Sequence, residues 1–332
     1  MEQFEYKSLK EQKKMTLDEL KTYHKALRKY EYETDKEIKG IELRKKTYYI
    51  IKFLLQIDKL IQRRSVTIIG DKRTSTDKPK IFACTHIGRF DIESAIEAMG
   101  EAAWFIMGDP GETYRNFDGF LLDIYGRSGF EMDDKFDAHT VNVRQTKILN
   151  QGGNELCFPE AAWNLDPIYP VGEIHPGVVR RAIKTGAVIV PVGIEQYRTK
   201  HRKKYYVNIG ENLDFSGASL SDAEELSEVV REHMISLKWD IFEKYGQAKR
   251  NDMDENWYKE LQKFIESIMI DTENGYTIEE IERTKYKSDK EKPETPNEVF
   301  SYLENIQLNN NNTFLASAIT AYNEANVLKK KL

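Results

Sequence analysis

The stretch at residues 80–100, KIFACTHIGRFDIESAIEAMG, decides how this chain of 332 residues folds. The short apolar run at 81–84 predicts a buried strand, and the segment at 92–99 has the composition of a helix. A strand followed at once by a helix is the basic unit of an α/β sheet. Ligands of such sheets bind at the carboxyl ends of the strands, which is where His86 stands.

His86 and Asp91, five positions later, form a pair suited to general-base catalysis. A histidine can act as a general base, and Asp91 can accept its second N–H, which fixes the tautomer and stabilises the imidazolium. Gly88 permits the tight turn between them. Alternatively, Asp91 only caps the following helix and His86 is a polar residue without a catalytic role.

Further apolar runs alternate with helix-compatible segments along the chain. Strands are predicted at 66–69, 104–107, 156–158, 188–192 and 204–213, and helices at 141–150, 178–185 and 222–244. This alternation predicts an α/β fold with a mostly parallel central sheet flanked by helices. The more polar ends of the chain predict helical N-terminal and C-terminal extensions.

Two later segments add polar groups at strand ends. In residues 154–167, NELCFPEAAWNLDP, a strand runs into Pro159 and Glu160, so a second carboxylate is expected beside the His86 loop. The alternative is a loop glutamate paired with an arginine. Further on, Gly177 opens a helix, and a buried strand contains Val-Pro-Val at 190–192.

Together these segments resemble the glycerolipid acyltransferase family, the lysophosphatidic acid acyltransferase group. His86 and Asp91 match its H-x4-D motif, and residues 158–160 match the first half of its F-P-E-G-T-R motif. Gly177 and the strand at 190–192 match later features of the family, whereas a further block is only faintly present at 129–135. The resemblance spans roughly residues 66–215.

The resemblance implies transfer of a fatty acyl group from acyl-CoA or acyl carrier protein to a hydroxyl. The acceptor would be a lysophospholipid of the 1-acylglycerol-3-phosphate type or a related glycolipid. His86 would take the acceptor proton, Asp91 would orient His86, and backbone N–H groups at a helix N-terminus would stabilise the oxyanion. It implies no cofactor beyond the thioester co-substrate, no metal and no covalent intermediate. The substrate-binding residues expected from the motifs are Gly88, Arg89, Glu160, Trp163 and Asn164.

The sequence departs from the family where the acceptor phosphate is bound. Ala162 and Trp163 stand where the family has threonine and arginine. An indole has one N–H donor and no charge, so it does not replace a guanidinium. Either another cation binds the phosphate or the acceptor differs, while Trp163 stacks on a sugar, lines an acyl channel or packs in the core. Candidate cations are Arg89, Arg127, Lys135 and Arg144.

The chain has two cysteines, Cys84 and Cys157, which excludes a disulfide framework and predicts a reducing cytosol. Cys84 lies two residues before His86, so in a strand both side chains share a face. A Cys–His nucleophilic pair is one interpretation of this spacing. A small buried apolar side chain is the other.

The N-terminal part is basic. Residues 1–80 hold 21 Lys and Arg against 13 Asp and Glu, a net charge of +8 in a chain whose total is −5. The overall charge argues against a nucleic-acid partner, whereas the local excess indicates an anionic surface partner or a solvated helical face. The apolar segment at 48–57 is too short to span a bilayer, which takes roughly 20 residues.

A helix is predicted over about 41–64 with one apolar stripe flanked by lysines and arginines. Such a helix lies on a membrane interface or packs its stripe on the protein core. The stripe consists of Tyr49, Ile50, Phe53, Leu54, Ile57, Leu60 and Ile61.

The sequence thus predicts three regions: a helical, basic, membrane-facing segment at 1–65, an acyltransferase domain at 66–250, and a helical tail at 251–332 with a linker near 284–297. The predicted location is cytoplasmic, peripheral on the inner face of the membrane. The alternative function is a non-catalytic protein that retains the acyltransferase fold and binds lipid or a membrane surface. The altered residues Ala162 and Trp163 favour this alternative, and the intact His86 and Asp91 oppose it.

Overall fold

A computed structural model describes residues 4–88, 90–108, 117–131, 133–164, 171–199, 202–245 and Tyr286. Arg89 lies outside the described residues. So do the predicted linker and C-terminal tail, apart from Tyr286.

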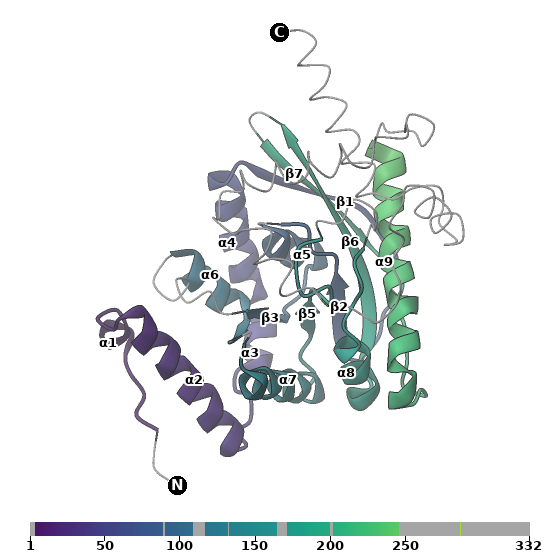
Figure 1. Ribbon diagram of the computed structural model, residues 1–332. Helices are drawn as coiled ribbons and strands as arrows, with labels where there is room; N and C mark the ends of the chain where they lie inside the picture. Colours follow the sequence, from purple (N-terminus) through teal and green to yellow (C-terminus); the bar gives the residue numbers. More distant parts are fainter. Residues whose placement is uncertain are drawn as a thin grey trace, which may run out of the picture.

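The described residues form a seven-stranded sheet in the order β1-β7-β6-β2-β5-β3-β4 (Figure 1). All neighbouring strands are parallel except β6 and β7, which form an antiparallel hairpin. The predicted α/β class with a mostly parallel sheet is therefore confirmed. The strands are β1 (Arg64–Asp71), β2 (Lys80–Cys84), β3 (Trp104–Gly108), β4 (Arg127–Phe130), β5 (Glu155–Cys157), β6 (Val188–Thr199) and β7 (Arg202–Ile209).

Helices cover both faces of this sheet (Figure 1). One core contains side chains of α4, α5 and α6 against the sheet, and a second contains side chains of α7, α8 and α9. The α-helices are α1 (Leu9–Gln12), α2 (Leu17–Glu33), α3 (Ile41–Lys46), α4 (Tyr48–Ile61), α5 (Asp91–Met99), α6 (Phe117–Tyr125), α7 (Lys135–Asn150), α8 (Gly177–Thr185) and α9 (Ala223–Tyr245); a 3₁₀ turn, η2 (Leu220–Asp222), precedes α9.

The elements differ from the sequence expectations in a few places. The single helix expected at 41–64 is interrupted at Thr47, which separates α3 from α4. Strand β6 continues to Thr199 rather than ending at 192, because β7 folds back and pairs with its second half. Helix α6 and strand β4 were not predicted. Strand β4 has only four residues, whereas Phe117, Phe120, Leu121 and Ile124 of α6 do recur at helical spacing.

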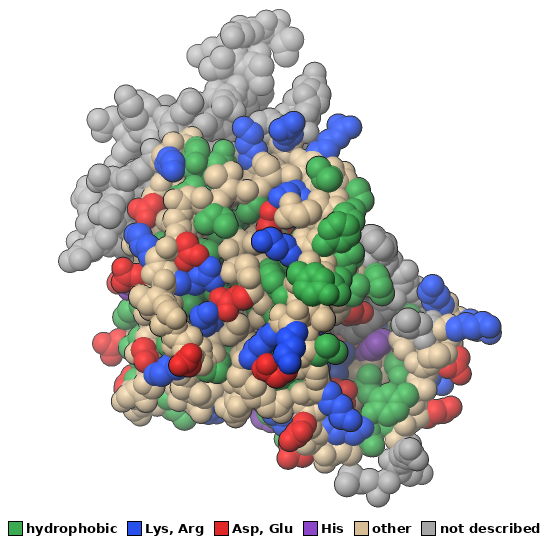
Figure 2. Space-filling view, turned by 180° about the vertical axis from the view of Figure 1, so that it is seen from behind, with side chains coloured by type: hydrophobic (Ala, Val, Ile, Leu, Met, Phe, Trp, Pro, Cys, Tyr) green, Lys and Arg blue, Asp and Glu red, His purple; other side chains and the backbone are tan. Residues whose placement is uncertain are grey.

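Helix α4 has apolar side chains on two opposite sides. Tyr48, Ile51 and Leu55 are buried against the sheet. The predicted apolar stripe points away from the protein: Tyr49 is 69% exposed, Phe53 63% and Leu60 78%. Apart from Leu54, which packs against the core, the stripe is therefore exposed, because Tyr48, Ile51 and Leu55 occupy the side that faces the sheet. Figure 2 shows hydrophobic side chains gathered on the flank of the molecule that α4 occupies.

Few of the cations around this stripe remain available to a partner. Arg44 donates to the carbonyl of Ile124, Lys59 pairs with Glu97, and Arg64 is buried against Asp58. Exposed cations near the stripe are Lys46, Lys52 and Arg63.

Within the described part of the chain, none of the helices is both long and apolar enough to cross a membrane.

Candidate active site

His86 and Asp91 meet at the carboxyl end of β2. The Nδ1 atom of His86 lies 2.7 Å from Oδ2 of Asp91. The same oxygen accepts the backbone N–H groups of Ile87 at 3.0 Å and Gly88 at 3.1 Å. The Asp91 carboxylate therefore holds both the imidazole and the turn that carries it. Because an ionised carboxylate only accepts, Nδ1 carries the proton, and Nε2 is left as the basic nitrogen.

Asp91 does not cap α5 in the way the sequence allowed as an alternative. The N-cap residue is Phe90, and Asp91 is the first helical residue. Its carboxylate accepts from Ile87 and Gly88 in the preceding turn, four and three residues before Asp91, rather than from the N–H groups of the helix itself. At the first turn the carboxylate also lies near the positive end of the helix dipole, which favours its charge.

The turn between His86 and Asp91 has strained backbone geometry. Phe90 has a φ of +72° and Gly88 a φ of +141°, both in the region that L-residues rarely adopt. Phe90 is nonetheless buried, which ties the turn to the core formed by α4, α5 and α6. Strain of this kind persists only where the surroundings over-determine the conformation, and it gathers at functional sites.

Glu160 and Asn164 hold the backbone of His86 at its N–H and at its carbonyl. Oε1 of Glu160 accepts the N–H of His86 at 2.9 Å, and the N–H of Asn164 donates to the His86 carbonyl at 2.8 Å. Oε2 of Glu160 accepts the N–H of Gly172 at 2.7 Å. Burial raises the pKa of Glu160, while the His86 N–H and the charge of Lys238 oppose the increase. Glu160 and Asn164 are 1% and 3% exposed, so they support the site from beneath.

Two aromatic rings stand beside the His86 imidazole. The Phe158 ring lies 4.5 Å from it, centroid to centroid, with 30° between the planes. Trp163 approaches edge-on at 6.2 Å. The His86 side chain remains 20% exposed beside these two rings. Among the predicted substrate-binding residues that the structure describes, Trp163 is the one whose side chain lies against the His86 imidazole.

The other predicted cations lie elsewhere or outside the described residues. Arg89 is among the residues that the structure does not describe. Arg127 pairs with Asp123 at the beginning of β4, and Arg144 pairs with Glu31 where α7 meets α2. Lys135 is the exposed first residue of α7. Arg127 and Arg144 thus serve contacts between elements.

Cys84 is fully buried within β2, and burial raises the pKa of its thiol well above the ordinary value. The nearest polar contact of its sulfur is the Phe82 carbonyl, 3.9 Å away. Since a nucleophilic cysteine needs a thiolate, this side chain is a core residue and not the partner of His86.

Sequence reasoning missed a buried charge pair beneath the site. Nζ of Lys238 on α9 lies 3.2 Å from Oε2 of Glu195 on β6, and both side chains are buried. A signal was present in the sequence. Lys238 takes a core position one turn after Met234, and Glu195 directly follows the buried apolar run at 188–194 of β6.

In the described part of the chain, neither a metal-binding group nor the cavity between α2 and α7 lies at this site. No group of three or more His, Cys, Asp or Glu among the described side chains is arranged to hold a metal ion. A cavity of about 430 Å³ lies between α2 and α7, and includes Arg28 and Arg144. These cations are paired with Asp137 and Glu31, so their charges are already compensated.

No protein-family model matches the chain, and no curated protein matches it. Among solved structures it is similar to the 1-acyl-sn-glycerophosphate (LPA) acyltransferase PlsC from Thermotoga maritima, with 18% sequence identity and a TM-score of 0.46. The alignment covers 68% of this chain and 91% of that protein. At such low identity, the activity of the neighbour does not transfer to this chain.

Proposed function

We propose that this protein transfers an acyl group from a thioester to a lipid hydroxyl, with His86 as general base. The observation that carries the proposal is the 2.7 Å contact between His86 Nδ1 and an Asp91 carboxylate that also receives two backbone N–H groups. This arrangement leaves Nε2 as the basic nitrogen of a side chain that is 20% exposed, at the carboxyl end of a parallel strand.

The reaction needs one base and no covalent enzyme intermediate. Nε2 of His86 takes the proton of the acceptor hydroxyl as its oxygen forms a bond to the thioester carbonyl carbon. The tetrahedral oxyanion then collapses, the C–S bond breaks, and the thiolate leaves with the proton that His86 returns. Asp91 stabilises the imidazolium that exists between these two proton transfers.

The acceptor proposed is a lysophospholipid of the 1-acylglycerol-3-phosphate type or a related glycolipid, and the donor is acyl-CoA or acyl carrier protein. The choice follows the motif residues His86, Asp91 and Glu160. Phe158 and Trp163 make an apolar wall beside the imidazole, which suits an acyl chain or the face of a sugar.

We further propose that α4 docks on the cytoplasmic face of an anionic membrane, where a lysolipid acceptor and its product reside. Its outer side exposes Tyr49, Ile50, Phe53, Leu60 and Ile61. Lys46, Lys52 and Arg63 are exposed along the same helix and its ends. An apolar stripe bordered by cations binds the interface by burying apolar area and by attraction to anionic lipid.

The activity is tested with purified full-length protein, a labelled acyl-CoA or acyl carrier protein, and a panel of lysolipids and glycolipids, with products identified by mass spectrometry. Wild type is expected to form an acylated lipid, and Asp91→Asn is expected to form it more slowly. Absence of product from every donor and acceptor pair, with vesicle binding intact, would favour the non-catalytic lipid-binding alternative.

Docking is tested by co-sedimentation of the full chain with anionic and neutral vesicles at low and high salt. Phe53→Gln with Leu60→Gln is expected to reduce binding strongly, because these side chains are 63% and 78% exposed and support no core. Leu220→Gln is the matched control, because Leu220 is a 44% exposed apolar residue on η2. Equal loss in both variants, or none in either, would contradict docking through α4.

A further inference from the structure

Ser94 on α5 holds the carbonyl of Phe90, the residue directly before Asp91. The Phe90 carbonyl accepts two hydrogen bonds from Ser94, one from its backbone N–H at 3.0 Å and one from its hydroxyl at 2.6 Å. Phe90 has a φ of +72°, which is unfavourable for a residue with a side chain. The conformation of this turn therefore depends on the contacts that surround Phe90.

Arg64, the first residue of β1, donates to the same hydroxyl. Its Nη1 lies 3.1 Å from the Ser94 oxygen. A guanidinium has no acceptor and a hydroxyl has a single proton, which Ser94 gives to the Phe90 carbonyl. The order of donors is therefore fixed, from Arg64 through Ser94 to Phe90. Because a charged donor polarises the hydroxyl that it binds, it strengthens the bond from Ser94 to Phe90.

The Arg64 guanidinium also faces the side chain of Phe90. Its Cζ atom lies 6.0 Å from the centroid of the Phe90 ring, and the Lys203 ammonium lies 4.7 Å from that centroid. The face of an aromatic ring attracts cations at such distances. Arg64 thus acts on Phe90 in two ways, at the carbonyl through Ser94 and at the ring directly.

This arrangement is closed off from solvent. Ser94 and the side chain of Arg64 are both 0% exposed. Nη2 of Arg64 donates to Oδ2 of Asp58 on α4 at 3.0 Å, which compensates the buried charge and fixes the guanidinium. Arg64 therefore joins β1, α4 and α5 at the start of the helix that carries Asp91.

We propose that Arg64 is a positioning residue of the active site, which acts through Ser94 on the turn that carries Asp91. It touches no substrate. Asp91 follows Phe90 directly, so a change in the Phe90 backbone displaces the carboxylate that lies 2.7 Å from Nδ1 of His86. The inference rests on the proposed function for its effect on turnover, whereas the tautomer of His86 can be measured without turnover.

The competing explanation is that Arg64 only compensates the buried charge of Asp58. Ser94→Ala separates the two explanations, because it removes the hydroxyl and keeps both charged residues. Ser227→Ala is the matched control, since Ser227 is also buried in a helix and its hydroxyl also donates to the carbonyl four residues earlier. Arg64→Lys is the second variant. A lysine retains the charge beside Asp58 but lacks the planar fork that binds two acceptors.

The experiment measures kcat, KM for the acceptor, thermal unfolding, and the tautomer of His86 from ring ¹⁵N shifts at pH 8 in protein labelled with ¹⁵N-histidine. The chain has six histidines, and His86→Gln assigns the ring signals. In Ser94→Ala and in Arg64→Lys we expect part of the His86 population to change from Nδ1–H to Nε2–H, because the carboxylate that fixes the tautomer is displaced. We also expect kcat to fall about 10-fold with little change in KM, less than the about 10²-fold that a displacement of about 1 Å costs.

Ser227→Ala is expected to keep the wild-type kcat and tautomer, while its unfolding temperature falls about as far as that of Ser94→Ala. Wild-type kcat and tautomer in folded Ser94→Ala would overturn the proposal. Changes in Ser94→Ala with none in folded Arg64→Lys would also overturn it, because compensation of Asp58 would then be the whole role of Arg64. An altered tautomer in Ser94→Ala, when even the wild type shows no acyl transfer, would retain the positioning role and reject the proposed function instead.

Discussion

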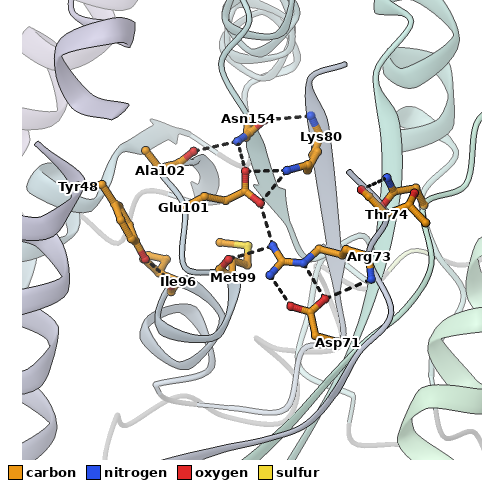
Figure 3. A network of polar contacts seen from close by, with 11 residues as sticks. Tyr48, Asp71, Arg73, Thr74, Lys80, Ile96, Met99, Glu101, Ala102 and Asn154 are labelled. Carbon is orange, nitrogen blue, oxygen red and sulfur yellow. Dashed lines mark hydrogen bonds and ion pairs between the residues drawn. The ribbon is translucent and has the colours of Figure 1, made fainter. Parts of the chain in front are cut away.

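The two ends of the central sheet both carry charged side chains, but they use them differently. We call them the His86 end, where β2 finishes, and the Glu101 end, where β2 begins. At the Glu101 end, side chains pair with one another: Glu101 binds Arg73, Lys80 and Asn154 within 2.8 to 3.0 Å (Figure 3). At the His86 end, the Asp91 and Glu160 carboxylates mainly grip backbone N–H groups.

The difference supports placing the proposed chemistry at the His86 end. The Glu101 end is saturated, since the Arg73 guanidinium also makes two contacts to Asp71 and one to the Met99 carbonyl. The His86 end fixes a loop and keeps the His86 side chain 20% exposed, with Nδ1 bound to Asp91. Among the described non-glycine residues with positive φ, Phe90 at +72° and Ala161 at +61° lie in loops at the His86 end, whereas Asp35 and Arg63 follow α2 and α4. A saturated network stabilises, whereas an unsaturated one on a rigid frame can react.

The largest effect is expected from His86→Ala at the His86 end. Removing the base should lower turnover by about 10²–10⁴-fold, the usual contribution of a positioned general base. The fold should persist, because the side chain is partly exposed and the backbone contacts to Glu160 and Asn164 do not need it. Steady-state kinetics and circular dichroism measure the two effects. Near-normal turnover in the folded variant would refute His86 as the base.

The pH dependence of stability and activity tests the role of Glu160 at the His86 end. Burial raises its folded pKa above the ordinary 4.5, so the folded state binds the proton more tightly than the unfolded state. Its contribution to stability is therefore complete below 4.5 and decreases as pH rises through the folded pKa. Activity should change in the opposite direction, because the ionised form holds the His86 N–H.

The measurement is urea unfolding and turnover at pH 5 and pH 8, for wild type and Glu160→Gln. On going to the higher pH, wild type should lose stability relative to the variant and gain turnover relative to it. A stability difference that does not depend on pH would mean that Glu160 has the same pKa in both states.

Glu101→Ala tests the other end of the sheet. It removes the shared partner of Arg73, Lys80 and Asn154, so we expect a loss of about 1–3 kcal/mol in the free energy of unfolding. Turnover should remain at the wild-type level, because the network lies at the opposite end of β2 from His86. A large fall in turnover at unchanged stability would contradict the claim that the Glu101 end only stabilises the fold.

The sequence predicted the strands, helices and turns that residues close together in the chain determine. The run at 81–84 falls within β2, and the turn from His86 to Asp91 spans only five residues. Contacts between residues far apart in the chain could not be predicted from local sequence. Lys238 meets Glu195 because Gly193 lets α9 approach β6, and the outward side of α4 depends on which apolar face the sheet selects. Both are decided by tertiary packing, so periodicity alone leaves them open.

The smallest effect is expected from Cys84→Ala, two residues from the base. Cys84 is fully buried in the core shared by α4, α5 and α6, and its raised pKa keeps it a thiol. Removing the sulfur leaves a small void, so a stability loss of about 1 kcal/mol is expected, measured by thermal unfolding. Turnover should be unchanged, because the acceptor oxygen attacks the thioester directly and no thiolate takes part. Mass spectrometry of wild type during turnover provides the control. An acylated Cys84 in wild type, together with lost turnover in the variant, would replace direct attack with a two-step mechanism through the cysteine.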